Sequence, residues 1–145
     1  MGWELAAVLA SGLFAGAAVY INLVEHPARV QCGPELAVTE FGPSYHRATV
    51  MQVPLAVIAL IAGIAAWISG SGIGWLVGGI ALGSVVPFTL AVILPTNKRL
   101  LDPALDPRSP QARDLLARWA RLHAVRSVLS VGAFALFACL LGVRT

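Results

Sequence analysis

Four long apolar runs constrain the fold of this chain more than any other feature of its sequence. They cover residues 3–24, 48–68, 73–94 and 124–143, and each is close to the roughly 20 residues that a helix needs to cross a bilayer. Backbone polar groups cannot stay unpaired in lipid, so such runs are expected to be helices. No run alternates with a period of two, which argues against a β-barrel. The sequence therefore predicts an all-α, integral membrane four-helix transmembrane bundle.

The composition supports this fold class. Hydrophobic residues make up 58% of the chain and charged residues 12%, whereas soluble domains have about 25% charged residues. We expect residues 1–145 to form a single transmembrane domain with helices at about 3–26, 46–68, 73–95 and 111–142. The Ser-Gly-Ser-Gly segment at 69–72 predicts a tight turn, and Gly-Pro and Asp-Pro dipeptides indicate longer connections over 27–45 and 97–110.

Basic residues are concentrated at one end of the predicted bundle. Nine of the ten Lys and Arg residues lie on the side of the two long connections, and only Arg144 lies on the side of the termini. The positive-inside rule then makes loops 27–45 and 97–110 cytoplasmic and places both termini on the non-cytoplasmic side of the cell membrane. This placement explains the net charge of +3 through contacts with membrane lipids, with no nucleic acid as a partner.

Small residues and prolines give expectations about packing. Within the apolar runs, three pairs of glycines are four residues apart: Gly12 and Gly16, Gly74 and Gly78, Gly79 and Gly83. Such spacing lets helix backbones approach closely, either within the bundle or in a homo-oligomer through these Gly-xxx-Gly faces. Pro54 and Pro87 lie inside apolar runs and are expected to kink their helices or to open local cavities.

Polar side chains converge on the cytoplasmic end of the predicted bundle. All three histidines, His26, His46 and His123, lie at this end, and the third helix supplies Asn97 there. Helical spacing places further polar residues on shared faces: Asn22 with His26 and Arg29, Tyr45 with Thr49 and Gln52, and Trp119 with His123, Arg126 and Ser130. Polar residues in membrane helices normally face the bundle interior, so these faces predict a pocket that opens toward the cytoplasm.

The individual residues of this pocket leave alternatives open. Trp119 and Tyr45 are either aromatic walls for a flat ligand or part of an interfacial aromatic belt. Arg126 precedes a long apolar run, where an unpaired charge is costly. We expect it to pair with Glu25, with carbonyl groups of the third helix or with an anionic ligand.

The histidines also raise the question of a cofactor. His26, His46 and His123, with Glu25 as a fourth ligand, are a candidate set for a transition metal, and two histidines are a candidate pair for haem. The sequence has no HExxH motif and no paired ligands at i, i+3 or i+4 on one helix, so the main expectation is that no cofactor is bound. Acid–base work by one histidine fits the same residues.

Two further function classes remain open from the residues alone. A non-enzymatic membrane protein that binds a lipid, quinone or metal would use the same pocket. A small exporter is the other alternative, although none of the four runs carries a carboxylate at its centre. Proton-coupled carriers usually need such a group near the middle of the membrane, which argues against antiport.

Four segments resemble the anthrone oxygenase-like family of small four-helix membrane proteins. They are GLFAGAAVYINLVEHPARV, YHRATVMQVPLAV, PTNKRLLDP and RWARLHAVRSVLS. The PTN segment and the W-x-x-x-H-x-x-R pattern, here Trp119, His123 and Arg126, are the most telling parts. The resemblance implies that some relatives use O2 as co-substrate to oxidise anthrones to anthraquinones without flavin or haem.

The resemblance also implies roles for the polar residues. His123 or His26 is the expected base, and Arg126 with Asn97 is expected to stabilise an oxyanion. Trp119 and Tyr45 are expected to hold the substrate rings. The remaining predicted substrate-binding residues are Asn22, His46 and Thr49. A lipophilic phenol, hydroquinone or quinone would satisfy the same pocket, so the implied activity is that of a membrane oxygenase or oxidoreductase for a lipophilic aromatic small molecule.

Overall fold

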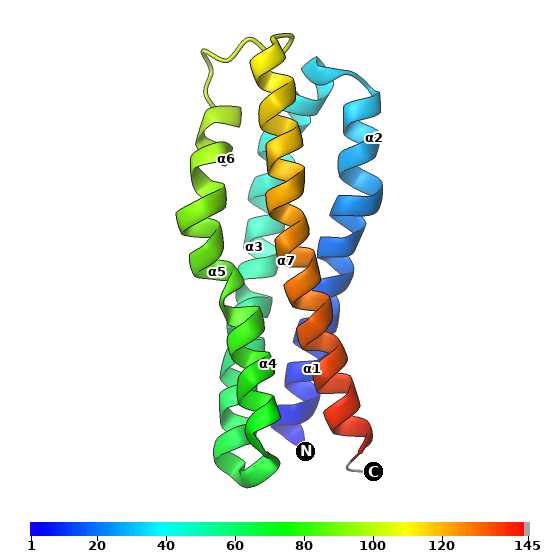
Figure 1. The fold of residues 1–145 in the computed structure, drawn as a ribbon, viewed down its shortest axis with the longest axis vertical. Helices are drawn as coiled ribbons and strands as arrows, with labels where there is room; N and C mark the ends of the chain where they lie inside the picture. Colours follow the sequence, from blue (N-terminus) through cyan, green and yellow to red (C-terminus); the bar gives the residue numbers. More distant parts are fainter. Residues whose placement is uncertain (144–145) are drawn as a thin grey trace.

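The computed structural model describes residues 1–143 as four helical columns joined by short connections (Figure 1). The first column comprises α1 (Gly2–Tyr20), η1 (Ile21–Glu25) and α2 (His26–Gln31), and the second comprises α3 (Pro34–Ala66) and η2 (Trp67–Ser71). The third comprises α4 (Ile73–Gly83), α5 (Val85–Phe88), η3 (Thr89–Ile93) and α6 (Leu94–Leu100), and the fourth is α7 (Pro110–Gly142). All four columns are long and apolar enough to cross a membrane, and the described residues contain no strand.

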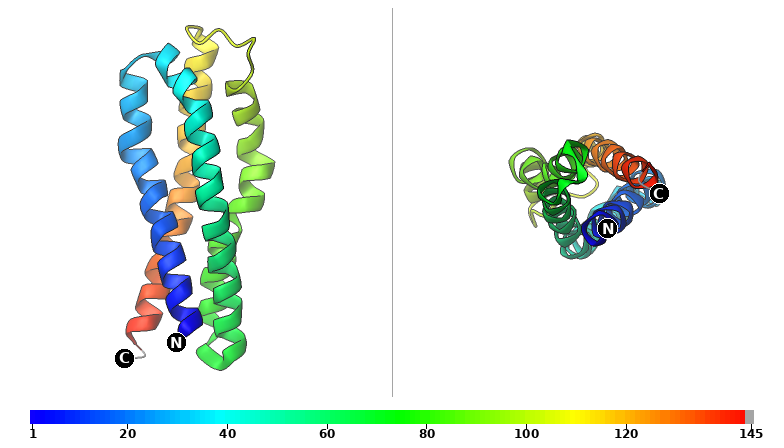
Figure 2. Two further views of the ribbon diagram at one scale, coloured as in Figure 1. Left: turned by 180° about the vertical axis from the view of Figure 1, so that it is seen from behind. Right: turned by 90° about the horizontal axis from the view of Figure 1, so that it is seen from below.

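The columns surround a common axis, as the end-on view in Figure 2 shows. α1 packs against α3 and α7, and α4 packs against the same two helices. The start of α1 and the end of α7 lie at the same end of the bundle as η2, and the other two connections lie at the opposite end (Figure 1). We call these the terminal end and the loop end. This arrangement confirms the predicted order of up and down helices. Arg144, which entered the charge count, lies outside the described residues.

The prediction of a long connection over 27–45 is wrong. The first column continues to Gln31 and α3 begins at Pro34, so only two residues join them. Gly33 has a φ of 98°, a conformation open mainly to glycine, and it reverses the chain. Pro34 then occupies the first helical turn, where its missing N–H leaves no bond unmade.

The connection between the third and fourth columns is shorter than expected and contains side-chain hydrogen bonds to the backbone. α6 continues to Leu100 and α7 begins at Pro110. Within the loop, the Asp102 and Asp106 side chains each accept a hydrogen bond from a backbone N–H two residues on, at 2.9 Å. The Ser109 side chain then caps α7 by accepting from the Ala112 N–H at 3.1 Å. The Asp-Pro and Ser-Pro dipeptides thus act as turn and cap residues.

Two columns are interrupted by π-helical turns, η1 in the first and η3 in the third. A π turn contains an extra residue, so the residues that follow it are rotated by about 100° relative to a continuous α-helix. The third column also breaks between α4 and α5, because Pro87 has no N–H to bond to the carbonyl of Gly83. Pro54, by contrast, lies inside α3 without ending it.

Glycines hold the terminal half of the bundle together. A Cβ added at Gly63 of α3 would lie 2.6 Å from the Trp75 carbonyl oxygen and 3.0 Å from the Gly79 Cα of α4. A Cβ added at Gly78 would lie 2.5 Å from the Phe137 ring of α7, which stacks on Trp75 at 5.2 Å. These glycines therefore serve close packing within the bundle.

Replacing Gly63 with alanine is expected to destabilise the protein by about 1–3 kcal/mol, because the backbone of α4 cannot move away from the added methyl group without disturbing the core. Thermal unfolding followed by circular dichroism in detergent measures this effect. Gly132→Ala is the matched control, since a Cβ there meets no atom within 4 Å. Equal unfolding midpoints for the two variants would contradict the close approach of α3 and α4.

Candidate functional site

The loop half of the bundle surrounds a cavity of about 90 Å³ to which all four columns contribute. Its walls are largely apolar, with Phe14, Ile21 and Val85 among the lining side chains. The polar residues that line it are Arg29, Ser44, Tyr45, Thr49, Gln52, Thr89, Asn97, His123 and Arg126. The predicted convergence of polar side chains on this end of the bundle is therefore confirmed.

His123 is held in one orientation by Asn22. The His123 side chain is only 2% exposed, and its Nδ1 lies 2.6 Å from Asn22 Oδ1. Asn22 Nδ2 donates to the Ala120 carbonyl at 3.2 Å, which identifies Oδ1 as the acceptor, and Ser127 Oγ donates to the same oxygen at 2.5 Å. Nδ1 therefore carries the proton and donates to Asn22, which leaves Nε2 with its lone pair. Asn22 thus positions His123 and does not itself line the cavity.

Arg126 contributes a positive charge that pairs with no carboxylate among the described residues. Its Nη2 donates to Gln52 Oε1 at 2.7 Å, and the guanidinium lies 5.5 Å from the centre of the Phe14 ring. Within residues 1–143, Arg126 forms no ion pair, and its Nε has no hydrogen-bond partner. A desolvated cation without a counter-ion favours the binding of an anionic group beside it.

Glu25, one of the partners expected for Arg126, is bound to Arg29 instead. Arg29 forms ion pairs with Glu25 and, through Nε at 2.8 Å, with Glu40 of α3. Its Nη2 also donates to Ser44 at 3.0 Å, and Ser44 donates to Glu25. Arg29 thus joins α3 to the first column close to the short connection between them. Because Glu25 is paired with Arg29, it does not pair with Arg126.

Two buried amides that line the cavity have unused hydrogen-bonding capacity. Asn97 and Gln52 are each 1% exposed, and both line the cavity. Neither Asn97 Nδ2 nor Asn97 Oδ1 has a partner among the described residues, and Gln52 Nε2 has none either. Buried polar groups in folded proteins are nearly always hydrogen-bonded, so these atoms indicate a polar ligand or water in the cavity.

The aromatic residues form one continuous wall. The Trp119 ring lies 4.7 Å from the His123 ring and 5.4 Å, edge-on, from Phe41. Phe41 in turn stacks on Tyr45 at 5.8 Å. Trp119 is buried, which does not fit a residue of an interfacial belt. Trp119 and Tyr45 both line the cavity, and Phe41, which the sequence did not single out, joins them.

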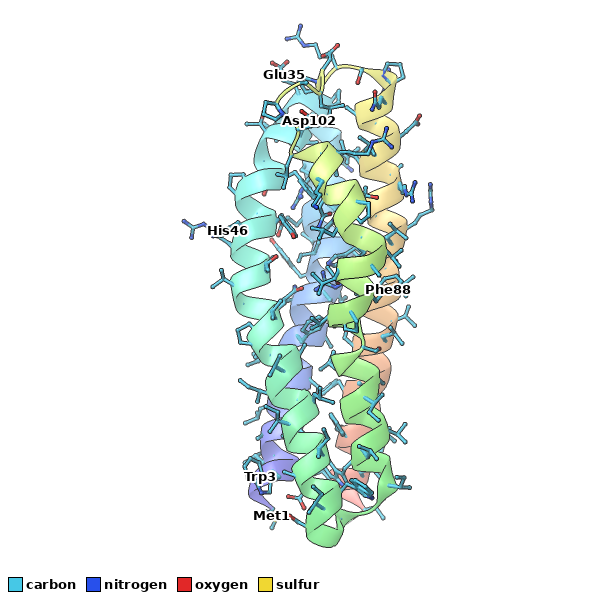
Figure 3. All side chains as sticks on the ribbon, turned by 90° about the vertical axis from the view of Figure 1, so that its left-hand side faces the viewer. Met1, Trp3, Glu35, His46, Phe88 and Asp102 are labelled. Carbon is cyan, nitrogen blue, oxygen red and sulfur yellow. The ribbon has the colours of Figure 1, made fainter. Side chains whose placement is uncertain are left out.

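Two of the three histidines lie outside the cavity. His26 contacts the Trp119 ring at 5.1 Å but lines a separate groove between α2 and α7. His46 is exposed on the outer side of α3 (Figure 3). Thr49, one turn further along α3, does line the cavity.

The predicted metal ligands are not brought together. His26, His46, His123 and Glu25 face different surroundings, as described above. Among residues 1–143, no group of three or more His, Cys, Asp or Glu side chains is placed to hold a metal ion. The chemistry that this site offers is that of an oriented imidazole, a guanidinium and two amides around an apolar space.

Most of the residues that line this cavity lie in a segment that matches a known protein family. Residues 41–136 match the family model described as anthrone oxygenase, a stretch that contains Gln52, Asn97, His123 and Arg126. The chain belongs to the anthrone oxygenase family. This membership confirms the resemblance carried by the PTN segment and by the W-x-x-x-H-x-x-R pattern.

Two relatives of this anthrone oxygenase family member are informative. The anthrone oxygenase tpcL of Aspergillus fumigatus is 40% identical over 78 residues, which cover 52% of this chain and 45% of that protein. An anthrone oxygenase of Claviceps purpurea is 29% identical over 136 residues, which cover 83% of this chain and 78% of that protein. The chain thus matches less than half the length of the Aspergillus relative. No solved structure matches the chain significantly.

The sequence of this family member did not predict which side chains hydrogen-bond to His123 and Arg126. Gln52 shared the spacing of Tyr45 and Thr49, but its contact with Arg126 joins two columns and has no signature in the sequence. Ser127 gave no signal beyond its position one turn after His123. Asn22 lies outside the matched segment 41–136, and only its place on a polar helix face pointed to it.

Proposed function

We propose that this chain is a membrane-embedded oxygenase that uses O2 to oxidise a lipophilic anthrone-, phenol- or quinol-like substrate in the cavity at the loop end. The observation that carries the proposal is that one apolar cavity holds both His123, oriented with Nε2 unprotonated, and Arg126, a cation without a counter-ion. The names of the two relatives support oxygenase chemistry.

The proposed reaction begins with proton transfer. His123 Nε2 removes one proton from the CH2 group that lies opposite the ketone of an anthrone. The electron pair left on carbon delocalises onto the ketone oxygen, and Arg126 with the Asn97 amide stabilises the negative charge there. The apolar walls exclude water, which strengthens both interactions.

The anion then supplies the electrons that reduce O2. A bond forms between the carbon and one oxygen atom, and protonation of the other oxygen gives a hydroperoxide. Loss of the second hydrogen from the same carbon, with cleavage of the O–O bond and release of water, leaves a second ketone. The balance is one CH2 group and one O2 converted to one C=O group and one H2O. Because the substrate anion is the reductant, the proposal needs no flavin, haem or metal.

Oxygen consumption by the purified protein tests the proposal. We expect O2 uptake that depends on an added lipophilic anthrone or hydroquinone and, for anthrones, one anthraquinone formed per O2 consumed. Saturable binding of these compounds without O2 uptake would overturn the oxygenase proposal and favour a binding protein. A panel of anthrones, phenols and hydroquinones covers the substrate classes that the cavity fits.

Replacing Asn22 with alanine is expected to lower kcat by up to about 10²-fold, because a base that is displaced or in the wrong tautomer no longer meets the substrate proton. The KM should change little, since Asn22 does not line the cavity. Initial rates of O2 uptake measure both constants. In a His123→Ala background the same change should have no further effect, because the two residues act as one unit. Additive losses would contradict the positioning role.

We also propose that the loop end faces the cytoplasm and the terminal end faces outward, as the placement of the basic residues predicts. Single cysteines at exposed positions test this after Cys32 and Cys139 are replaced by serine. In intact cells, a membrane-impermeant maleimide is expected to label Ser69→Cys, in the turn at the terminal end. Ala104→Cys, in the loop between α6 and α7, should be labelled only after permeabilisation. The reverse pattern would overturn the orientation.

A further inference from the structure

A groove of about 660 Å³ opens on the outer side of the bundle between the first column and α3. Exposed apolar side chains border it, including Tyr20 from the first column and Met51 from α3. Four residues line both this groove and the cavity beside it: Ile21, Ser44, Ala48 and Gln52. The groove and the cavity are therefore adjacent spaces that meet at these four residues, which we call the shared wall.

The two volumes decide what each space can hold. Sites for small organic ligands usually enclose about 300–1,000 Å³. The cavity, at about 90 Å³, holds no more than about one ring. The groove, at about 660 Å³, lies within the usual range. A substrate with several fused rings fits this protein only if most of it lies in the groove.

We propose that the substrate lies across both spaces and arrives sideways from the lipid phase between α1 and α3. Its reacting edge lies in the cavity with His123 and Arg126, and its other rings lie in the groove. The occupant is a flat, uncharged and lipid-soluble aromatic molecule, which concentrates in the bilayer because its apolar surface leaves water. This inference rests on the proposed function and adds to it the route and the place of the ring system.

The shared wall carries a polar group suited to such a ligand. Gln52 lines both spaces and is almost fully buried, and its Oε1 is bound to Arg126 while its Nε2 has no partner. An oxygen on the ligand would meet this N–H donor where the groove joins the cavity. A buried amide N–H is unfavourable when it stays unpaired, so the site favours a ligand that supplies the acceptor.

The walls of the groove fit an aromatic body with a polar end. Gly16 leaves open space, since a Cβ there would meet no atom within 4 Å, and Ala17 lies beside it. Glu25, Glu40 and Arg47 line the part of the groove nearer the loop end. Hydroxyl groups of the ligand can reach these charges while its rings contact the apolar part.

Protection of a thiol in the groove tests the proposal. In a protein with Cys32 and Cys139 replaced by serine, we expect anthraquinone to slow the reaction of Gly16→Cys with a small maleimide in detergent. At a concentration about ten times its Kd, the rate should fall about tenfold, in proportion to the fraction of protein left unbound. Gly132→Cys is the matched control, because Gly132 also meets no atom within 4 Å and does not line the groove. Its labelling rate should not change.

The outcomes separate this inference from the oxygenase proposal. Two results would overturn the proposal that the substrate rings lie in the groove. One is an unchanged labelling rate of Gly16→Cys at concentrations that saturate anthraquinone binding, and the other is the absence of anthraquinone binding. Protection without O2 uptake supports the groove as a binding site and contradicts the oxygenase. O2 uptake without protection supports the oxygenase and contradicts the lateral route. If Gly16→Cys does not fold, Ala17→Cys probes the same wall.

Discussion

Replacing His123 with alanine is expected to lower kcat for anthrone oxidation by about 10²–10⁴-fold, the range that a well-placed general base contributes. His123 is the one histidine that lines the cavity, and Asn22 fixes its tautomer. His123→Gln, which can still donate to Asn22 but is not a base, should lose activity to the same extent. Substrate-dependent O2 uptake measures the rates, and circular dichroism verifies that the variants remain folded.

His46→Ala provides the matched control for this experiment. The side chain of His46 is exposed on the outer side of α3 and does not line the cavity, so its removal should leave the rate unchanged. Full activity in a folded His123→Ala protein would refute the assignment of His123 as the base. An equal loss in both variants would indicate a general effect of removing histidine rather than chemistry in the cavity.

Replacing Arg126 with methionine is expected to lower kcat by about 10²–10³-fold, as the loss of one oxyanion-stabilising donor does in other enzymes. Methionine preserves much of the apolar stem but removes the charge and the donor groups. Thermal stability should not fall in parallel, because the guanidinium is partly desolvated without a carboxylate partner and its removal relieves that penalty. Initial rates and unfolding midpoints of the same preparations test both statements.

Two further variants sharpen this prediction. Arg126→Lys keeps a positive charge and should recover part of the lost rate, although a single ammonium cannot reproduce the fork geometry of the guanidinium. Arg121→Met removes an exposed arginine of the same helix and should leave the rate unchanged. A loss of stability that matched the loss of activity in Arg126→Met would instead identify Arg126 as a structural residue.

The sequence predicted the four columns because lipid leaves little choice to a run of about 20 apolar residues. It did not predict the helix ends at the first connection. Gly33-Pro34 and Gly42-Pro43 look alike as dipeptides, yet only Gly33 adopts a positive φ. Gly42 remains helical in α3, where a Cβ would lie 3.3 Å from the Leu101 side chain. A Gly-Pro pair therefore does not by itself end a helix. At Gly33 the glycine adopts a positive φ and the chain reverses, whereas at Gly42 the backbone stays helical.

The candidate site was predictable where the helix is regular. α7 runs unbroken from Pro110 to Gly142, so the spacing of Trp119, His123 and Arg126 placed all three on the cavity. The same argument failed for His26, because the π turn η1 cannot be read from residue spacing and changes which side chains share a face. The contacts of Gln52 and Asn22 with α7 join separate columns, and no single helix encodes them.

The glycine contacts between α3 and α4 lie in the terminal half of the bundle, and the cavity and the groove lie in the loop half. These glycine contacts are thereby separated in space from the residues that line the cavity and the groove. A search for altered substrate preference can vary the side chains around Gly16, Ala48 and Met51 while it leaves the glycine-packed half unchanged. Changes to the ligand-contacting side chains can therefore be made without altering the close backbone approach of α3 and α4.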